Sequence, residues 1–261
     1  MLPTGIGILL IAHGSKETGW MQSVEELAEH LPFPLEVAYL ETDKGTTIAE
    51  GVRRLERMNA SRILAIPLFV SSGSAHLEEI KYALGLVSTP KVETGLDPIR
   101  TSAAIRLSPA MDDHPCILEI IRERIASLSQ APAGENLLLV AHGSGHPDLH
   151  PIWEETLTRM AKHFQKLDRF QSVSYATVHP NTIREQAERM SANRLLVIPL
   201  FLSEGYFTRT FIRSQLNGLN FVYSGQAYLP HPMLSNWIMQ MADEGFAGQH
   251  SACRSVDLSF P

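Results

Sequence analysis

A short phrase that occurs twice constrains this chain more than any other feature. The run LLIAHGS covers residues 9–15, and the near copy LLVAHGS covers residues 138–144. An apolar run that ends in a polar turn is typical of a buried strand in a parallel sheet. The carboxyl ends of such strands are where open α/β sheets bind ligands. The sequence therefore predicts that each half of the chain presents one histidine, His13 or His142, at a place suited to chemistry.

A second matching pair of segments shows that the whole chain is a tandem repeat. The segment AIPLFVS at residues 65–71 corresponds to VIPLFLS at residues 197–203. A small, polar link between the halves marks a domain boundary. We predict an N-terminal domain over residues 1–130, a degenerate C-terminal repeat over residues 136–246 and a poorly ordered tail over residues 247–261.

The periodicity of apolar residues predicts strands that alternate with helices in both halves. The predicted strands cover residues 6–12, 35–40, 63–66 and 92–96, and then residues 137–141, 173–176 and 195–198. This alternation indicates mostly parallel sheets with right-handed crossover helices. The expected fold class is α/β, with two tandem three-layer α/β/α domains that face each other across a cleft.

Composition excludes several classes of protein. The 261 residues are 44% hydrophobic and 19% charged, with a net charge of −6, which suits a globular protein and argues against nucleic-acid binding. No apolar stretch reaches the ~18 residues that a membrane span needs. Cys116 and Cys253 are too far apart in sequence to indicate an iron–sulfur or cysteine zinc site. This cysteine usage favours a reducing compartment, and we expect a cytoplasmic protein.

The apolar first eleven residues lack the basic start and small-residue cleavage site of a signal peptide, and we interpret them as the first strand.

Three potential metal ligands follow the first three predicted strands. They are His13, Glu41 and His76. Neighbouring parallel strands lie about 4.8 Å apart, so side chains at their ends can converge on one ion. Two imidazoles and one carboxylate suit a divalent metal such as Fe(II), Co(II), Ni(II) or Zn(II), and three protein ligands leave open positions. The sequence therefore predicts a metal site in the first half.

The second half retains only part of this pattern. His142 is present, but the position that matches Glu41 falls near Ala176 or Thr177, and the position that matches His76 is Thr208. We therefore expect the second half to supply shape and substrate contacts, with His142 as a hydrogen-bonded structural residue.

Each of these residues also has a simpler interpretation. Glu41 can be a plain surface carboxylate, and Glu78 and Glu79 fit the start of a helix, where negative charge is favourable. His114 and His231 each precede a proline and a helical pattern, so we interpret them as turn or cap residues, with a role in the cleft as the alternative.

Taken together, the motifs resemble the sirohydrochlorin chelatase family, the class II chelatases that insert cobalt or ferrous iron into a modified tetrapyrrole. The resemblance rests on residues 12–15, on residues 39–41, and on residues 67–69 followed by Gly73 and His76. It extends to about Met241, and the partial second copy is similar to the long, two-repeat form. It implies a flavodoxin-like, chelatase-like fold and a metal chelatase (a lyase) of siroheme or cobalamin biosynthesis. It also implies that His13 and His76 bind metal and serve the insertion step, with assistance from Glu41.

The resemblance also suggests the ligands of the protein. The substrates would be a sirohydrochlorin-like tetrapyrrole and Co²⁺ or Fe²⁺, with Ni²⁺ as a further option, and no tightly bound cofactor is expected. We expect a monomer with an internal pseudo-two-fold repeat, without nucleic-acid or membrane partners. Cations that we expect to meet the carboxylates of the macrocycle are Lys16, Lys44, Arg209 and Arg213. Aromatic residues that either pack on the ring or belong to the core are Phe69, Phe201, Tyr206 and Phe207.

Two other functions fit parts of the sequence. A non-enzymatic carrier of metal or tetrapyrrole would use the same ligands without turnover. A hydrolase or phosphatase could use the His-Gly-Ser phrase, but Ala12 stands where phosphatases with a nucleophilic histidine carry arginine. The Gly-x-Ser-x-Gly turn of α/β-hydrolases is also absent.

Overall fold

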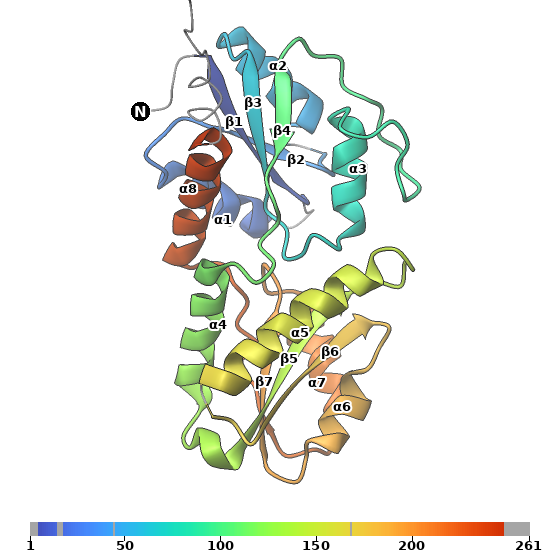
Figure 1. Cartoon of the computed structure of the whole chain (residues 1–261), viewed down its shortest axis with the longest axis vertical. Helices are drawn as coiled ribbons and strands as arrows, with labels where there is room; N and C mark the ends of the chain where they lie inside the picture. The colour runs from blue at the N-terminus through green and yellow to red at the C-terminus, as the bar shows by residue number, and fades with distance from the viewer. Residues whose placement is uncertain (1–4, 15–17, 44, 168, 248–261) are drawn as a thin grey trace, which may run out of the picture.

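Two four-stranded parallel sheets form the framework of the protein (Figure 1). The computed structural model describes residues 5–14, 18–43, 45–167 and 169–247. The first sheet has the order β2-β1-β3-β4 and the second the order β6-β5-β7-β8, so the two repeats share one topology and the predicted α/β class is confirmed. The strands of the first sheet are β1 (Ile6–Ala12), β2 (Glu36–Tyr39), β3 (Arg62–Pro67) and β4 (Ala104–Leu107). Those of the second are β5 (Glu135–Gly143), β6 (Ser172–His179), β7 (Arg194–Leu200) and β8 (Phe221–Val222).

Helices cover both faces of each sheet, because the central strands carry apolar side chains on both faces and these must be buried. In β1, Ile8 and Leu10 pack toward one hydrophobic cluster, whereas Leu9 and Ile11 pack toward another. The helices are α1 (Thr18–Glu29), α2 (Ile48–Arg57), α3 (Ala75–Ala83), α4 (Pro115–Leu128), α5 (His150–Leu167), α6 (Ile183–Arg189), α7 (Ile212–Gln215) and α8 (Pro232–Ala247). A 3₁₀ turn, η1 (Pro132–Gly134), and a π-helical turn, η2 (Phe207–Phe211), complete the set. Among the described residues, no helix combines the length and the apolar character that crossing a bilayer requires.

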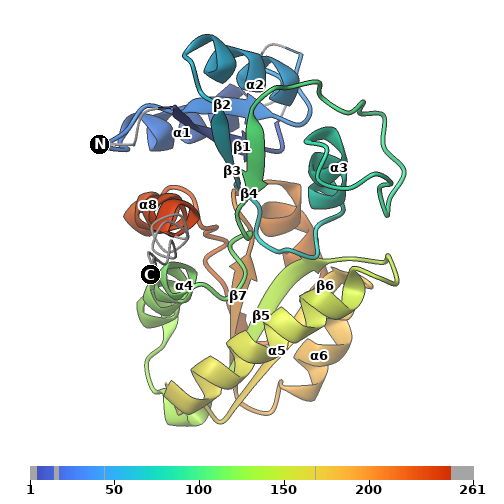
Figure 2. The ribbon, with the colours of Figure 1, turned by 45° about the horizontal axis from the view of Figure 1, so that its top comes forward.

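The closing helix of each repeat packs on the sheet of the other repeat. Helix α4 ends the first repeat but contacts β7 of the second sheet, whereas α8 ends the second repeat but contacts β3 of the first sheet. The two helices also contact each other, and both views draw α8 directly above α4 (Figures 1 and 2). The link at residues 130–136 therefore divides the repeats in sequence, while the packed layers cross that boundary.

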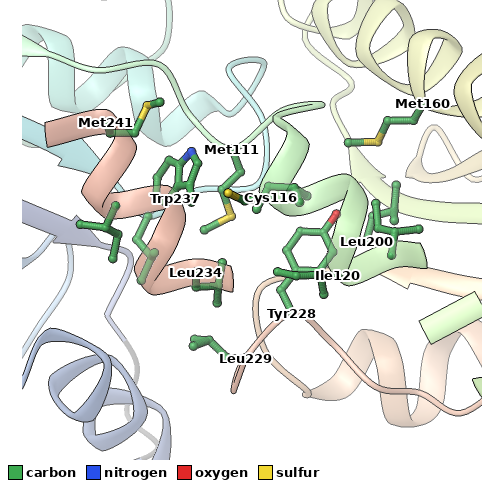
Figure 3. Close-up of a cluster of buried hydrophobic side chains, with 14 of the residues drawn as sticks. Met111, Cys116, Ile120, Met160, Leu200, Tyr228, Leu229, Leu234, Trp237 and Met241 are labelled. Atoms are coloured by element: carbon green, nitrogen blue, oxygen red, sulfur yellow. The ribbon is translucent and has the colours of Figure 1, made fainter. Parts of the chain in front are cut away.

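A single hydrophobic cluster joins the two halves around these exchanged helices (Figure 3). Its members include Cys116 and Ile120 from α4, Trp237 from α8, and Leu200 at the end of β7. Trp237 is fully buried and is the largest such side chain in the described part of the chain. Because large aromatic groups contribute much of the burial free energy of a core, this cluster fixes how the two sheets are placed relative to each other.

The fourth strand of the first sheet lies later in the chain than we expected. We expected a strand at residues 92–96, but the edge strand is β4, which pairs with residues 62–65 of β3. The earlier segment instead follows α3, where Thr94 bonds the side chain of Glu79 and Leu96 packs beside the α2 and α3 cluster. The expectation was wrong because β4 occupies the edge of β3, so residues 92–96 have no strand partner there.

The structure confirms that His114 and His231 are cap residues. His114 Nδ1 accepts a hydrogen bond from the backbone N–H of Cys116 at 3.2 Å, and His231 Nδ1 accepts one from Met233 at the same distance. Each histidine thus satisfies a free donor at the start of α4 or α8. The predicted tail falls outside the described residues except for Ala247, the last residue of α8.

A glycine after each strand-end histidine lets two neighbouring strands approach closely. Gly14 has φ +95°, and a Cβ atom there would lie 1.7 Å from the carbonyl oxygen of Glu41. Gly143 has φ +72°, and its Cβ would lie 2.3 Å from the carbonyl oxygen of His179. Only glycine adopts this backbone without strain and leaves room for the adjacent chain. These glycines therefore decide where the rings of the preceding histidines lie.

We expect Trp237→Ala to lower the free energy of unfolding by about 3–5 kcal/mol, because it leaves a large cavity in the shared cluster. Chemical denaturation followed by circular dichroism measures this change. The control is Gln240→Ala, an exposed position on the same helix, where we expect a change within about 0.5 kcal/mol. Equal stabilities of the two variants would show that the cluster does not join the halves.

We expect Gly14→Ala to lower the free energy of unfolding by about 1–3 kcal/mol through backbone strain. The clash of the new Cβ atom with the carbonyl oxygen of Glu41 should lower it further. The matched control is Gly19→Ala in α1, where a new Cβ meets no atom within 4 Å. There alanine should leave stability unchanged or raise it slightly. Thermal unfolding of both variants is the measurement, and a Gly14→Ala protein as stable as the wild type would contradict the turn geometry.

Candidate metal and substrate site

The structure brings two of the three predicted ligands into direct contact. His13 follows β1 and His76 lies in the first turn of α3, and their Nε2 atoms are 3.1 Å apart. The ring centroids are 4.4 Å apart with an interplanar angle of 82°, so the two rings meet edge to face. Both side chains are partly buried.

The hydrogen bonds of the two rings determine which nitrogens carry protons. His13 Nδ1 lies 2.9 Å from the carbonyl oxygen of Gly14, which can only accept, so Nδ1–H donates. His76 Nδ1 lies 2.9 Å from a carboxylate oxygen of Glu79 and donates to it as well. In the neutral rings both Nε2 atoms then carry lone pairs, which repel unless a proton or a metal cation lies between them. Two nitrogens bound to one tetrahedral ion such as zinc would be about 3.3 Å apart, close to the observed spacing. The pair is thus arranged to hold a cation.

Glu79 orients His76, a role that sequence reasoning missed. Its second carboxylate oxygen accepts a hydrogen bond from Thr94 Oγ1 at 3.1 Å, which holds the carboxylate in place. A carboxylate on the far nitrogen of a histidine fixes the tautomer and makes the ring a stronger metal ligand. We interpreted Glu79 only as a residue of the helix start, although its i,i+3 spacing from His76 was a usable signal. Its neighbour Glu78 is buried and pairs with Lys81 at 2.6 Å.

Glu41 lies beside His13 in the backbone, but its side chain does not join the two imidazoles. Its backbone N–H donates to the carbonyl oxygen of His13 at 2.8 Å, while its side chain is exposed and lies outside the cavity lining. Within the described residues, no three His, Cys, Asp or Glu side chains are grouped closely enough to hold a metal. The structure therefore places two imidazoles together and leaves the carboxylate apart.

The second half presents its own pair of imidazoles. The rings of His142 and His179 have centroids 4.9 Å apart, and the Phe207 ring is nearly perpendicular to the His142 ring with centroids 5.2 Å apart. Both histidines are accessible to solvent. The surrounding cavity walls nevertheless desolvate His142 and lower its pKa, and His179 and His76 act in the same direction.

His179 is the residue that corresponds to Glu41, so the expected match near Ala176 or Thr177 was wrong. In the first sheet Ala12 pairs with Tyr39, and in the second Ala141 pairs with Thr177. Two residues further along the strand, Glu41 and His179 occupy equivalent places. The error arose because we ended the predicted strand at residue 176, whereas β6 continues to His179. The hydrogen-bond register decides the correspondence.

Thr208 has a structural role at the expected counterpart of His76. It is buried, and its Oγ1 accepts a hydrogen bond from the backbone N–H of Gly205 at 2.9 Å. This bond stabilises the turn before η2. The second half thus carries imidazoles on its strand ends but none on its following helix.

One cavity of about 550 Å³ contains all four imidazoles. Its walls come from both halves: the strand-end and loop residues after β1, β3, β5, β6 and β7, together with Trp20 and Trp153. Trp153 Nε1–H donates to the carbonyl oxygen of Gly73 at 2.9 Å and so ties the first-half loop to α5. The volume lies within the range of roughly 300–1,000 Å³ that is usual for sites of organic ligands, and far exceeds the needs of a metal ion alone.

In the part of the chain that the structure describes, aromatic side chains line this cavity and no Lys or Arg does. Phe201 and Phe207 are stacked with centroids 6.0 Å apart at 24°, and Tyr206 is 65% exposed beside them. Of the expected rim cations, Arg209 lies 3.6 Å from Glu204 and Arg213 lies over the ring of Tyr223. Neither arginine lines the cavity. Lys16 and Lys44 lie outside the described residues.

Curated relatives match about a third of this chain. The sirohydrochlorin cobaltochelatase of Saccharolobus solfataricus is 33% identical over 89 residues, which are 33% of this chain and 69% of that protein. The protein of the same name from Saccharolobus islandicus is 33% identical over 84 residues, which are 31% of this chain and 65% of that protein. The chain therefore spans about two thirds of the length of these relatives.

Solved structures share the fold over nearly the whole chain. SirB from Bacillus subtilis with Fe³⁺ has a TM-score of 0.74 at 18% identity, covering 95% of this chain and 98% of that one. The sirohydrochlorin chelatase SirB from Bacillus subtilis subspecies spizizenii in complex with cobalt has a TM-score of 0.69 at 19% identity, covering 94% and 98%. The family model CbiX matches residues 7–128 and again residues 136–244. Since both repeats match this model, the chain belongs to the CbiX family.

Proposed function

We propose that this chain is a metal chelatase that inserts Co²⁺ or Fe²⁺ into sirohydrochlorin or a closely related tetrapyrrole, in siroheme or cobalamin biosynthesis. The observation that carries the proposal is the pair His13 and His76, whose Nε2 atoms lie 3.1 Å apart inside a cavity large enough for an organic ligand. Membership of the CbiX family and the names of the curated relatives support the same reaction.

In this proposal His13 and His76 hold the incoming metal through Nε2, while Glu79 keeps His76 oriented. Imidazole suits Co²⁺, Fe²⁺, Ni²⁺ and Zn²⁺, so the choice among these ions depends on their supply as well as on the site. Glu41 is the proposed third ligand. Its side chain is exposed next to His13 and must turn toward the pair to reach the ion.

The proposed reaction balances with the groups present in the cavity. The macrocycle brings two pyrrole N–H groups, the metal ion replaces both protons, and two protons leave. When the ion moves to the ring nitrogens, the Nε2 lone pairs that held it become free to accept those protons. Imidazole exchanges protons in the physiological pH range, which suits this step. Protons also compete with metal for the same lone pairs, so insertion should slow at acid pH.

The aromatic residues give the planar macrocycle a surface to stack on. Phe201 and Phe207 line the cavity from the second half, and Phe69 lines it from the first, with its ring 6.1 Å from that of His76. Lys16, Lys44, Arg209 and Arg213 remain the proposed partners of the peripheral carboxylates, the two arginines from outside the cavity lining. We also propose a monomer, because one chain supplies both walls of the cavity, and a cytoplasmic location, on the basis of the cysteine content.

The insertion assay is the direct test. We expect the purified protein to insert Co²⁺ or Fe²⁺ into metal-free sirohydrochlorin faster than buffer does, as followed by absorbance. His13→Ala and His76→Ala should each lower the rate about 100-fold or more, and Glu41→Gln should lower it less. His163→Ala, an exposed position on α5, is the control and should not change the rate. A wild-type rate equal to that of buffer would contradict the proposal, and retained macrocycle binding in that case would favour a carrier.

The role of Glu79 has a separate test. Glu79→Gln keeps the size of the side chain but removes its charge, so His76 becomes a weaker ligand. We expect the affinity for Co²⁺, measured by titration of its visible absorbance, to fall about 10–100-fold. Glu93→Gln changes an exposed carboxylate on the following loop and should leave the affinity unchanged. Equal affinities for Glu79→Gln and the wild type would remove Glu79 from the site.

A further inference from the structure

We propose that His142 and His179 form a second binding site for a divalent transition-metal ion, on the second-half wall of the same cavity. This inference rests on the proposed function in one respect: a chelatase receives divalent transition-metal ions in this cavity. The ligands themselves are a separate set from His13 and His76.

The backbone places these two histidines as it places the first site. Gly143 pairs with His179 across β5 and β6, so His142 and His179 project from the carboxyl ends of adjacent parallel strands. They occupy the places of His13 and Glu41 in the first sheet. The ring centroids are 4.9 Å apart and the ring planes are inclined by 54°, so both rings lie within reach of one ion.

The hydrogen bonding of His142 leaves a ligand atom free. His142 Nδ1–H donates to the carbonyl oxygen of Gly143 at 3.1 Å, as His13 Nδ1–H does to Gly14. The lone pair of the neutral ring is then on Nε2. In the described part of the chain, no hydrogen bond reaches that Nε2 atom or either ring nitrogen of His179. Both rings line the cavity, so these nitrogens are open to an ion that enters it.

Phe207 contacts the two imidazoles without using their ring nitrogens. Its ring is nearly perpendicular to both imidazoles, with its centroid 5.2 Å from that of His142 and 6.4 Å from that of His179, so an apolar ring lies beside both. A purely structural pair of histidines would be expected to use its nitrogens in hydrogen bonds to the protein. Here the apolar contact positions the rings while the nitrogens remain available.

The donor set indicates the class of ion. Two neutral imidazoles suit Co²⁺, Ni²⁺, Zn²⁺ or Cu²⁺, whereas Mg²⁺ and Ca²⁺ prefer oxygen ligands. The remaining coordination positions would be filled by water. An ion held here lies in the same cavity as the ion at His13 and His76, so the protein can carry two ions before the macrocycle binds.

The test counts cobalt ions bound to the full-length protein without any macrocycle, by equilibrium dialysis and visible absorbance. We expect two Co²⁺ per chain for the wild type and one for His142→Ala/His179→Ala. We also expect one for His13→Ala/His76→Ala, and none when all four are replaced. His30→Ala/His163→Ala changes two exposed histidines outside the cavity and should still bind two. His142→Gln/His179→Gln is a second variant that should also bind one Co²⁺. Its thermal unfolding, compared with that of the wild type, shows whether the loss of cobalt reflects loss of the fold.

Two results would overturn the second site. One is a wild type that binds a single ion which the His142/His179 variants retain. The other is loss of all bound cobalt in either double variant, which would indicate one shared site of four imidazoles. If the His142/His179 variants alone lose the only ion, the second site stands and the proposed role of His13 and His76 fails. The count needs no chelatase activity, so it is independent of the insertion assay.

Discussion

The packing of α4 and α8 between the two sheets is the interaction on which the cavity depends. Each helix covers the sheet of the other repeat, and the cluster around Trp237 holds both in place. Burial of this apolar surface stabilises one relative placement of the two sheets. Because the carboxyl ends of both sheets line one cavity, that placement decides which strand-end residues face each other. The relative position of the two halves of the site is therefore set by a hydrophobic core that contains none of the candidate ligands.

The same local backbone geometry orients one imidazole in each half. Gly14 and Gly143 adopt positive φ, and the preceding histidine donates its Nδ1 proton to the glycine carbonyl. The other nitrogen is then free to bind a cation. The halves differ in the source of the second imidazole, because the first half adds His76 from α3 whereas the second adds His179 from β6. One repeated phrase therefore supports two different imidazole pairs within a single cavity.

The candidate site could be predicted only in part. The periodicity placed His13 at the end of a buried strand, and the structure sets it against His76, as two ligands in neighbouring positions suggested. Glu41 follows the expected strand, but the direction of its side chain depends on packing that spacing does not reveal. His179 was missed because the predicted strand ended at residue 176, three residues before the end of β6. Continuing that strand through its apolar residues would have reached it.

Local sequence patterns alone predict the α/β class, the tandem repeat, the helix caps at His114 and His231, and the histidine at the end of each first strand. These features follow from periodicity and turn chemistry, which act over a few residues. Three further features emerge from the folded chain: the exchange of closing helices, the 3.1 Å distance between the Nε2 atoms of His13 and His76, and the contact of His142 with His179. Each of these depends on strand register and on packing between segments far apart in the chain, which local sequence patterns do not specify.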